Sequence, residues 1–159
     1  MKYLFDSNIF IRSKNEMPMD TWPTFWTRMT EMIMAGQVYI SVKVKQEIEN
    51  GNDELTDWLK KSAPQSCFVP IDSDILIKYG ETQNWAALQP FKEQARQVFA
   101  QVADAYIVAT AAAKNMTLVT YEKSNPLSKS RVMIPDACDA IGADYCDLNA
   151  ALRGMNIKI

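Results

Sequence analysis

Residues 3–8 read Tyr3-Leu4-Phe5-Asp6-Ser7-Asn8, three apolar residues followed directly by three polar ones. The apolar run predicts a short strand over residues 2–6, buried on both faces as the strands of parallel sheets are. Asp6 then stands at the carboxyl end of that strand, where open α/β sheets bind their ligands. An ordinary turn or helix-capping acid could occupy the same place, because Asp, Ser and Asn all suit turns.

Strand-like and helix-like patterns alternate along the rest of the chain. Short apolar runs predict further strands at residues 38–40, 67–69, 116–120 and 131–134. Capping residues and helical spacing predict helices at 20–36, 41–51, 53–61, 72–79, 90–102, 105–112 and 147–153, and one starting at Pro135. The stretch 80–89 favours neither state. This alternation predicts an α/β fold, a three-layer α/β/α sandwich with a central, mainly parallel sheet.

The length of 159 residues suits one domain with a proper core, so we expect a single domain over residues 1–159. The longest uncharged, apolar-leaning run, residues 105–113, is far shorter than the roughly 20 residues that cross a bilayer. Asp6 interrupts the start of the chain where a signal peptide needs its apolar centre. We therefore expect a cytoplasmic protein with no membrane partner.

The numbers of cysteines and histidines and the net charge limit the kinds of active site that the chain can form. The chain has 3 cysteines, and this odd number without a secretion signal predicts reduced thiols, with Cys67 in the core. It has no histidine, which excludes a Ser-His-Asp triad, a Cys-His dyad, a histidine zinc site and a histidine base. The net charge of −2 gives no general attraction to nucleic acid, so such binding needs a local basic patch or a metal ion.

Three further acids stand where the predicted sheet could bring them to the same edge as Asp6. Glu47 lies on a half-buried helix face, where it could instead be a solvated acid paired with a lysine one turn earlier. Asp104 opens an alanine-rich helix, where it could instead be a capping acid favoured by the helix dipole. Glu122 follows a buried strand, where it could instead be a loop acid beside Lys123.

Carboxylates grouped without histidine suit Mg²⁺ or Mn²⁺, which prefer oxygen ligands. Four close carboxylates also repel one another strongly, so such a group predicts cations that neutralise it. Two oxygen-bound cations can activate a water molecule and stabilise the leaving oxygen of a phosphodiester. The candidate catalytic residues and metal ligands are therefore Asp6, Glu47, Asp104 and Glu122.

Four motifs follow one another along the chain. They are Tyr3-Leu4-Phe5-Asp6-Ser7-Asn8, Val44-Lys45-Gln46-Glu47-Ile48, Ala103-Asp104-Ala105-Tyr106-Ile107-Val108-Ala109 and Leu118-Val119-Thr120-Tyr121-Glu122. In this order they resemble the PIN-domain nucleases over nearly the whole chain. The similarity is greatest to small bacterial PIN-like proteins, including the VapC-like toxins of toxin–antitoxin pairs. It implies a three-layer α/β/α fold whose acids bind Mg²⁺ or Mn²⁺ and cut RNA.

The resemblance assigns the metal-binding and catalytic roles to the four acids, with Glu122 where the family usually has Asp. Asn8 and Thr120 match positions that often assist through hydrogen bonds, and Lys123 could meet the phosphate backbone of a substrate. It further implies an RNA substrate, a cognate antitoxin as partner and, as often in the family, a homodimer. The Met- and Trp-rich segment 15–36 departs from the shortest toxins, and its helical stripe is either core or a partner surface.

We therefore expect a metal-dependent endoribonuclease, the toxin of a type II toxin–antitoxin pair. Two other functions remain open at this point. A phosphatase of the haloacid-dehalogenase type would use Asp6 as its nucleophile, although Asn8 stands where such enzymes ordinarily have a second Asp. A non-catalytic PIN-like module would bind a partner and cut nothing.

Overall fold

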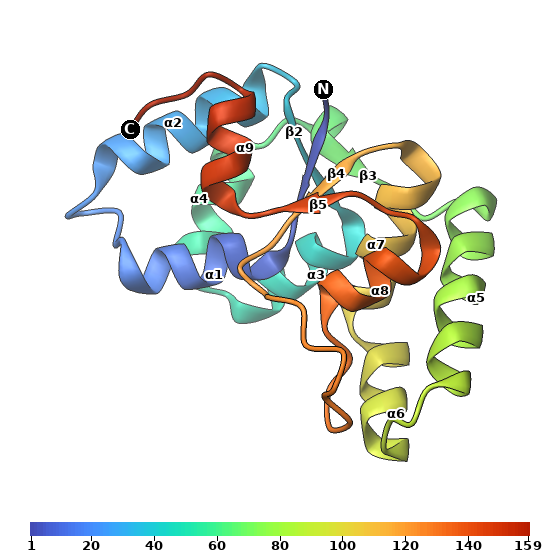
Figure 1. The fold of residues 1–159 in the computed structure, drawn as a ribbon. Coiled ribbons are helices and arrows are strands. Elements are labelled where there is room, and N and C mark those ends of the chain that lie inside the picture. The colour runs from blue at the N-terminus through green and yellow to red at the C-terminus, as the bar shows by residue number, and fades with distance from the viewer.

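The computed structural model describes residues 1–159 and contains a five-stranded sheet with helices on both faces (Figure 1). The strand order is β3-β2-β1-β4-β5, and every neighbouring pair is parallel. The strands are β1 (Tyr3–Phe5), β2 (Val38–Ser41), β3 (Phe68–Val69), β4 (Thr117–Val119) and β5 (Tyr145–Cys146). The predicted α/β fold with a parallel sheet is thereby confirmed.

Nine α-helices connect and cover these strands. They are α1 (Ser7–Glu16), α2 (Pro23–Met34), α3 (Val42–Gly51), α4 (Glu54–Ser62), α5 (Ser73–Leu88), α6 (Glu93–Gln101), α7 (Ala103–Lys114), α8 (Ile134–Ile141) and α9 (Leu148–Gly154), with a 3-10 turn at Gln65–Cys67. Helices α5, α7 and α8 pack on one another, while α1 and α2 both pack on α4 (Figure 1). Helix α6 and the lower end of α5 project beyond the sheet together with the 120–133 connection, which joins β4 to α8.

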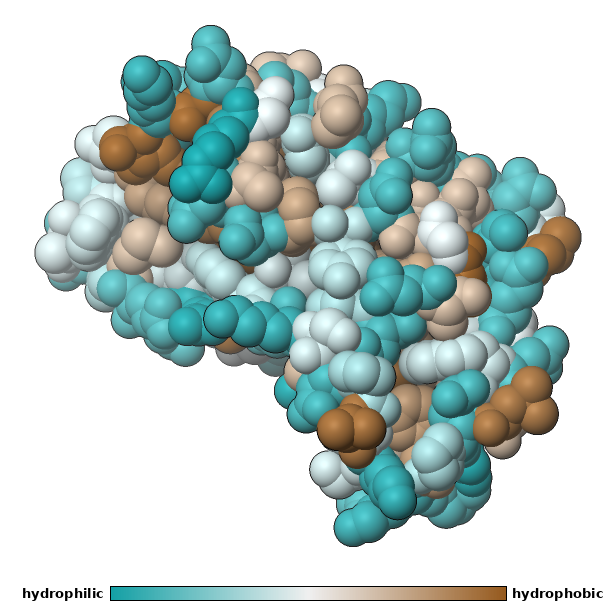
Figure 2. Space-filling model, in the orientation of Figure 1, coloured by the Kyte–Doolittle hydropathy of each residue, from teal (hydrophilic) through white to brown (hydrophobic).

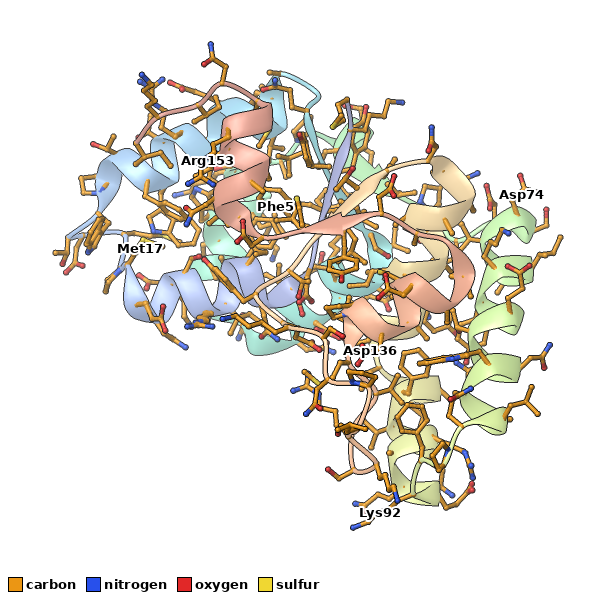
Figure 3. The ribbon with its side chains drawn as sticks, viewed as in Figure 1. Phe5, Met17, Asp74, Lys92, Asp136 and Arg153 are labelled. Carbon is orange, nitrogen blue, oxygen red and sulfur yellow. The ribbon has the colours of Figure 1, made fainter.

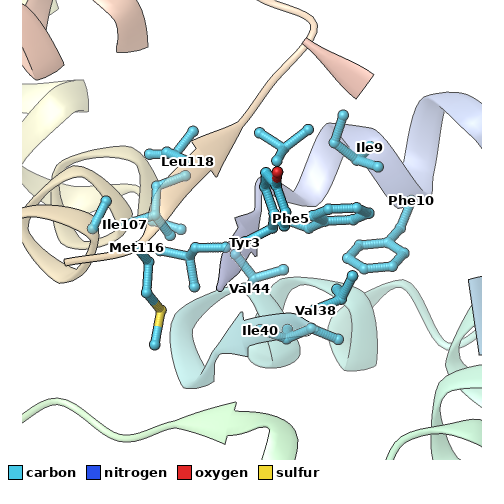
Figure 4. Close-up of a cluster of buried hydrophobic side chains, with 14 of the residues drawn as sticks. Tyr3, Phe5, Ile9, Phe10, Val38, Ile40, Val44, Ile107, Met116 and Leu118 are labelled. Atoms are coloured by element: carbon cyan, nitrogen blue, oxygen red, sulfur yellow. The ribbon is translucent and has the colours of Figure 1, made fainter. Parts of the chain in front are cut away.

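Strand β1 lies at the centre of the sheet because its three residues are apolar and can be buried on both faces. Leu4 and Phe5 are 0% exposed. Phe5 packs in a cluster that includes Val38 from β2 and Leu118 from β4 (Figure 4). Its ring centroid lies 5.8 Å from that of Phe10 on α1, which attaches this helix to the sheet. Burial of these side chains holds the short strand in place.

The Met- and Trp-rich stripe of the segment 15–36 forms part of the core. Helix α2 buries Phe25, Trp26, Met29, Met32 and Ile33. The Trp26 ring meets the edge of the Trp58 ring on α4 at a centroid distance of 4.9 Å. This stripe, which could have been either core or a partner surface, is therefore a packed face. Of its residues, only Trp22, just before the helix, is about half exposed.

The prediction of a strand at residues 131–134 is wrong. Ile134 begins helix α8, with Pro135 in its first turn, and the preceding residues pair with no strand. The strand that pairs with the outer edge of β4 is β5, which was not predicted. β5 has only two residues, and Tyr145 is 37% exposed, so it lacks the apolar run by which buried strands are found.

Three helices also differ from the sequence prediction. Helix α1 begins directly after Asp6, and most of its residues are polar, so its pattern gave little signal. Helix α5 continues through Gly80 and the ambiguous stretch up to Leu88, and α6 starts at Glu93 rather than at Pro90. The space between α5 and α6 is therefore a short turn.

On the face shown in Figure 2, hydrophilic residues are spread widely, and the most strongly apolar residues form a few separate patches. No helix of the chain has both the length and the apolar character that a membrane span requires. The three cysteines form no disulfide, and Cys67 and Cys138 are buried.

Removal of a central side chain should destabilise the whole domain. We expect Leu4→Ala to lower the free energy of unfolding by about 2–5 kcal/mol, because Leu4 is fully buried and the cavity cannot collapse between two paired strands. Urea unfolding followed by circular dichroism measures the change.

Leu127→Ala is the matched control, because Leu127 is 88% exposed and should change the stability by no more than about 0.5 kcal/mol. Equal losses in the two variants would contradict the central position of β1.

Candidate functional site

Asp6 is carried to the carboxyl edge of the sheet by the strand before it. Its N–H donates to the carbonyl of Val119 at 3.0 Å, which extends the parallel pairing of β1 with β4 by one step. Asp6 is the N-cap residue of α1, yet its side chain makes no cap hydrogen bond. The side chain is instead buried, with the whole residue only 1% exposed. Asp6 is therefore a buried acid at the sheet edge and not a solvated turn residue.

Thr120 joins two of the candidate acids. Its hydroxyl donates to Asp6 Oδ2 at 3.0 Å and accepts from the N–H of Glu122 at 3.0 Å. The residue is 1% exposed and directly follows β4, so the neighbouring strands fix this link. The assisting hydrogen bond expected of Thr120 is present, while its contact with a substrate stays a prediction.

Glu47 and Asp104 come from two helices, α3 and α7, that pack on each other. Glu47 Oε1 accepts a hydrogen bond of 3.4 Å from the N–H of Ala103, at the start of α7. Asp104 follows in the first turn of that helix. Glu47 is thus turned to the N-terminus of α7 and not to Lys43, whose ammonium lies over the Tyr106 ring at 4.6 Å.

Glu122 is held by groups of the protein itself. Arg131 Nη2 donates to its Oε2 at 2.9 Å, and the N–H of Ile134 donates to its Oε1 at 3.1 Å. Only 9% of the Glu122 side chain is exposed. Through these two contacts Glu122, near the beginning of the 120–133 connection, binds residues at its end. Glu122 is therefore not a free loop acid beside Lys123.

The negative charges of other candidate acids raise the pKa of both Asp6 and Asp104. Burial, followed by repulsion from Glu122 and Glu47, raises the pKa of Asp6 to about 6, although its hydrogen bond from Thr120 opposes the rise. Burial, followed by repulsion from Asp6, Glu122 and Glu47, raises the pKa of Asp104 to about 7, and nearby Arg131 opposes that rise. The sheet edge therefore gathers negative charge from distant parts of the sequence.

A divalent cation fits the chemistry of this group of oxygens. As the side chains lie, no three Asp, Glu, Cys or His residues surround one point closely enough to hold an ion. Glu47 accepts a hydrogen bond from Ala103, and Glu122 pairs with Arg131. No hydrogen bond is among the causes that shift the pKa of Asp104, which are burial and nearby charges. Buried carboxylates that repel one another are hard oxygen ligands of the kind that Mg²⁺ and Mn²⁺ take.

The remaining predicted site residues lie at the exposed rim of the candidate site. Asn8, in the first turn of α1, and Lys123, after Glu122, are both exposed. One pair at this rim was not predicted, since the guanidinium of Arg12 lies over the Tyr121 ring at 4.8 Å. Had α1 been predicted as a helix, Arg12 could have been placed on the same face as Asn8, because the two residues stand one turn apart.

Solved structures share this fold. The VapBC2 structure from Rickettsia felis, bound to a DNA fragment from their promoter, has 19% identity and a TM-score of 0.53, covering 76% of this chain and 86% of that one. FitAcB from Neisseria gonorrhoeae has 18% identity and a TM-score of 0.55, covering 90% and 95%. FitAB bound to an IR36 DNA fragment has 18% identity and a TM-score of 0.56, covering 91% and 94%.

The order of the parallel strands and these likenesses define a protein with the PIN-like α/β fold. A comparison with curated proteins gave no match. Residues 3–159 match a family model, and the chain belongs to that family, described as a domain of unknown function (DUF4411).

The raised pKa values predict how stability depends on pH when divalent cations are removed. Folded Asp6 and Asp104 keep their protons up to about pH 6 and about pH 7, whereas the ordinary value is 3.8. The folded chain binds more protons than the unfolded chain in this window, so raising the pH favours unfolding. We expect the free energy of unfolding in EDTA to fall as pH rises from about 4 to about 7.

Urea unfolding at several pH values tests this slope. Asp104→Asn should make the slope shallower and should stabilise the chain at neutral pH, because it removes the larger of the two shifts. A wild-type stability that rises over this window, or an unchanged slope in the variant, would contradict the proposed crowding of charge.

Proposed function

We propose that the chain is a Mg²⁺- or Mn²⁺-dependent endoribonuclease that cleaves phosphodiester bonds of RNA. The observation that carries the proposal is the electrostatic coupling of Asp6 and Asp104 at the carboxyl edge of the sheet. Burial and the charges of other acids raise the pKa of both carboxylates, and Asp6 is one of the acids that act on Asp104. With no histidine in the chain, such a pair suits a divalent cation better than a proton relay. The PIN-like fold supports the same assignment.

Asp6, Glu47 and Asp104 would hold the metal, with Glu122 as the fourth acid. Such an ion, when bound, acts as a Lewis acid on the phosphate and stabilises the charge of the leaving oxygen. The chain's own contribution is to fix the oxygens, since Thr120 holds Asp6 by a hydrogen bond of 3.0 Å. Asn8 and Lys123, exposed at the rim, would then contact the substrate.

We further propose that the protein is the toxin of a type II toxin–antitoxin pair, with a cognate antitoxin as partner and a homodimer as the assembled form. The VapBC2 and Fit structures cover most of this chain with the same fold, and the family resemblance links that fold to toxin–antitoxin pairs. A cytoplasmic location is part of the same proposal.

Asp6→Asn should abolish cleavage and leave the fold intact, because the amide keeps the volume and the hydrogen bond from Thr120 but loses the negative charge. Total RNA incubated with Mn²⁺, with and without EDTA, measures the activity, and circular dichroism checks the fold. Asp74→Asn is the matched control, since Asp74 stands at the start of α5, away from the start of α8 that follows the 120–133 connection (Figure 3).

The alternatives predict different results in the same assay. Metal-dependent cleavage that survives Asp6→Asn would remove Asp6 from its role, and wild-type chain that cuts no RNA would contradict the nuclease. A trapped phosphoryl group on Asp6 would indicate a phosphatase. Tight binding of a partner without any cleavage would indicate a non-catalytic module.

Induced expression of the chain should slow bacterial growth if it acts as a toxin. The Asp104→Asn variant should relieve the effect, and co-expression of a small protein encoded next to the gene should relieve it for the wild type as well. Growth is followed by optical density, with protein levels checked by blotting. Equal growth inhibition by wild type and Asp104→Asn would contradict a toxin that acts through this site.

A further inference from the structure

A cavity of about 300 Å³ adjoins the candidate site between α6 and the 120–133 connection. We call it the α6 pocket. Asp104 forms part of its wall, so the pocket opens beside one of the candidate acids. The connection is tied to the start of α6 by a hydrogen bond of 2.9 Å from the N–H of Lys92 to the carbonyl of Lys129. Helix α6 and the connection lie side by side in Figure 1 as well.

The α6 pocket has an apolar floor and a polar rim. Phe99 and Val132 are buried beneath it, and Val98 presents an aliphatic side chain that is 50% exposed. Gln94 and Ser130 are exposed at the rim, so their donors and acceptors can reach a ligand. Flat, uncharged rings with polar edges suit such a lining, because the ring faces lie on apolar groups while the edges meet the amide and hydroxyl.

Arg131 connects the pocket with the candidate site. Its Nη2 pairs with Glu122 at 2.9 Å, and 54% of its side chain is exposed, so its other N–H groups remain available. A guanidinium can bind a phosphate through two N–H groups and can also stack on a nucleobase. Arg131 lines the pocket as well, so one residue can meet both the base and the adjoining phosphate of a bound strand.

We propose that the α6 pocket binds one unpaired nucleobase of an RNA strand, beside the phosphodiester at the four acids. This inference rests on the proposed function and adds to it a pocket that binds one base of the substrate. A base in a duplex cannot enter the pocket without leaving its stack, which costs free energy. A bare phosphate would leave the apolar floor of the pocket uncovered, whereas a nucleobase joined to its phosphate can fill the floor and also meet Arg131.

Gln94 would be the residue that distinguishes between bases. Its amide presents one acceptor and two donors, the groups by which glutamine recognises base edges. Gln97 lies on the same helix and is also exposed, but it does not line the pocket. The two positions therefore form a matched pair for the same substitution.

The test measures binding of labelled RNA by fluorescence anisotropy in the Asp6→Asn background, where the strand stays intact. The probes are single-stranded homopolymers of the four bases and a duplex of mixed sequence. We expect the preferred single strand to bind about tenfold more tightly than the duplex. Gln94→Leu should weaken that preferred strand about fivefold and level the preference among bases, whereas Gln97→Leu should change neither.

Equal binding of duplex and single strand would overturn the proposal, and so would equal effects of Gln94→Leu and Gln97→Leu. Failure of the nuclease is a separate result. Wild-type chain that cuts no RNA with Mn²⁺ would refute the catalytic proposal, while a base preference that depends on Gln94 would still establish the pocket. Cleavage by the wild type without that dependence would refute the pocket alone.

Discussion

The parallel pairing of β1 with β2 on one side and β4 on the other is the constraint on which the rest of the structure depends. A three-residue strand makes few sheet hydrogen bonds, so the burial of its side chains has to hold it in place. Once β1 is fixed, the N–H of Asp6 meets the carbonyl of Val119, and the residue is almost completely buried. The apolar residues before the acid, rather than any attraction of its own, determine where it lies.

Buried negative charge is unfavourable unless it is paired, and the site pairs its acids unequally. Glu122 has a full ion pair with Arg131, and Asp6 has a hydroxyl of Thr120. Asp104 has only the charge of Arg131 to favour its charged form, and its pKa is higher than that of Asp6. The unpaired charge is therefore concentrated on the aspartates, where either a proton or a cation has to offset it.

The sequence was most informative where an acid directly follows or opens an apolar element. Asp6 and Asp104 could be placed at one sheet edge because a buried strand or an alanine-rich helix fixes the backbone next to each of them. The ion pair of Glu122 with Arg131 could not be predicted, because the path of an irregular connection brings the two residues together and no sequence periodicity indicates that path. The same connection gave the false strand at 131–134, since residues buried under a loop are as apolar as those of a strand.

The strand order places the site at a change of direction. From β1 the chain proceeds to β2 and β3 and then crosses to β4 on the other side of β1, and such a switch point leaves a crevice at the carboxyl ends of the two central strands. A net charge of −2 gives the protein no long-range attraction for RNA, so the proposed binding of RNA would depend on local groups. Arg131 pairs with Glu122 and also lines the α6 pocket. A ligand that binds the remaining N–H groups of Arg131 therefore shares this guanidinium with Glu122, so the charge of the acid group and the occupancy of the pocket are linked.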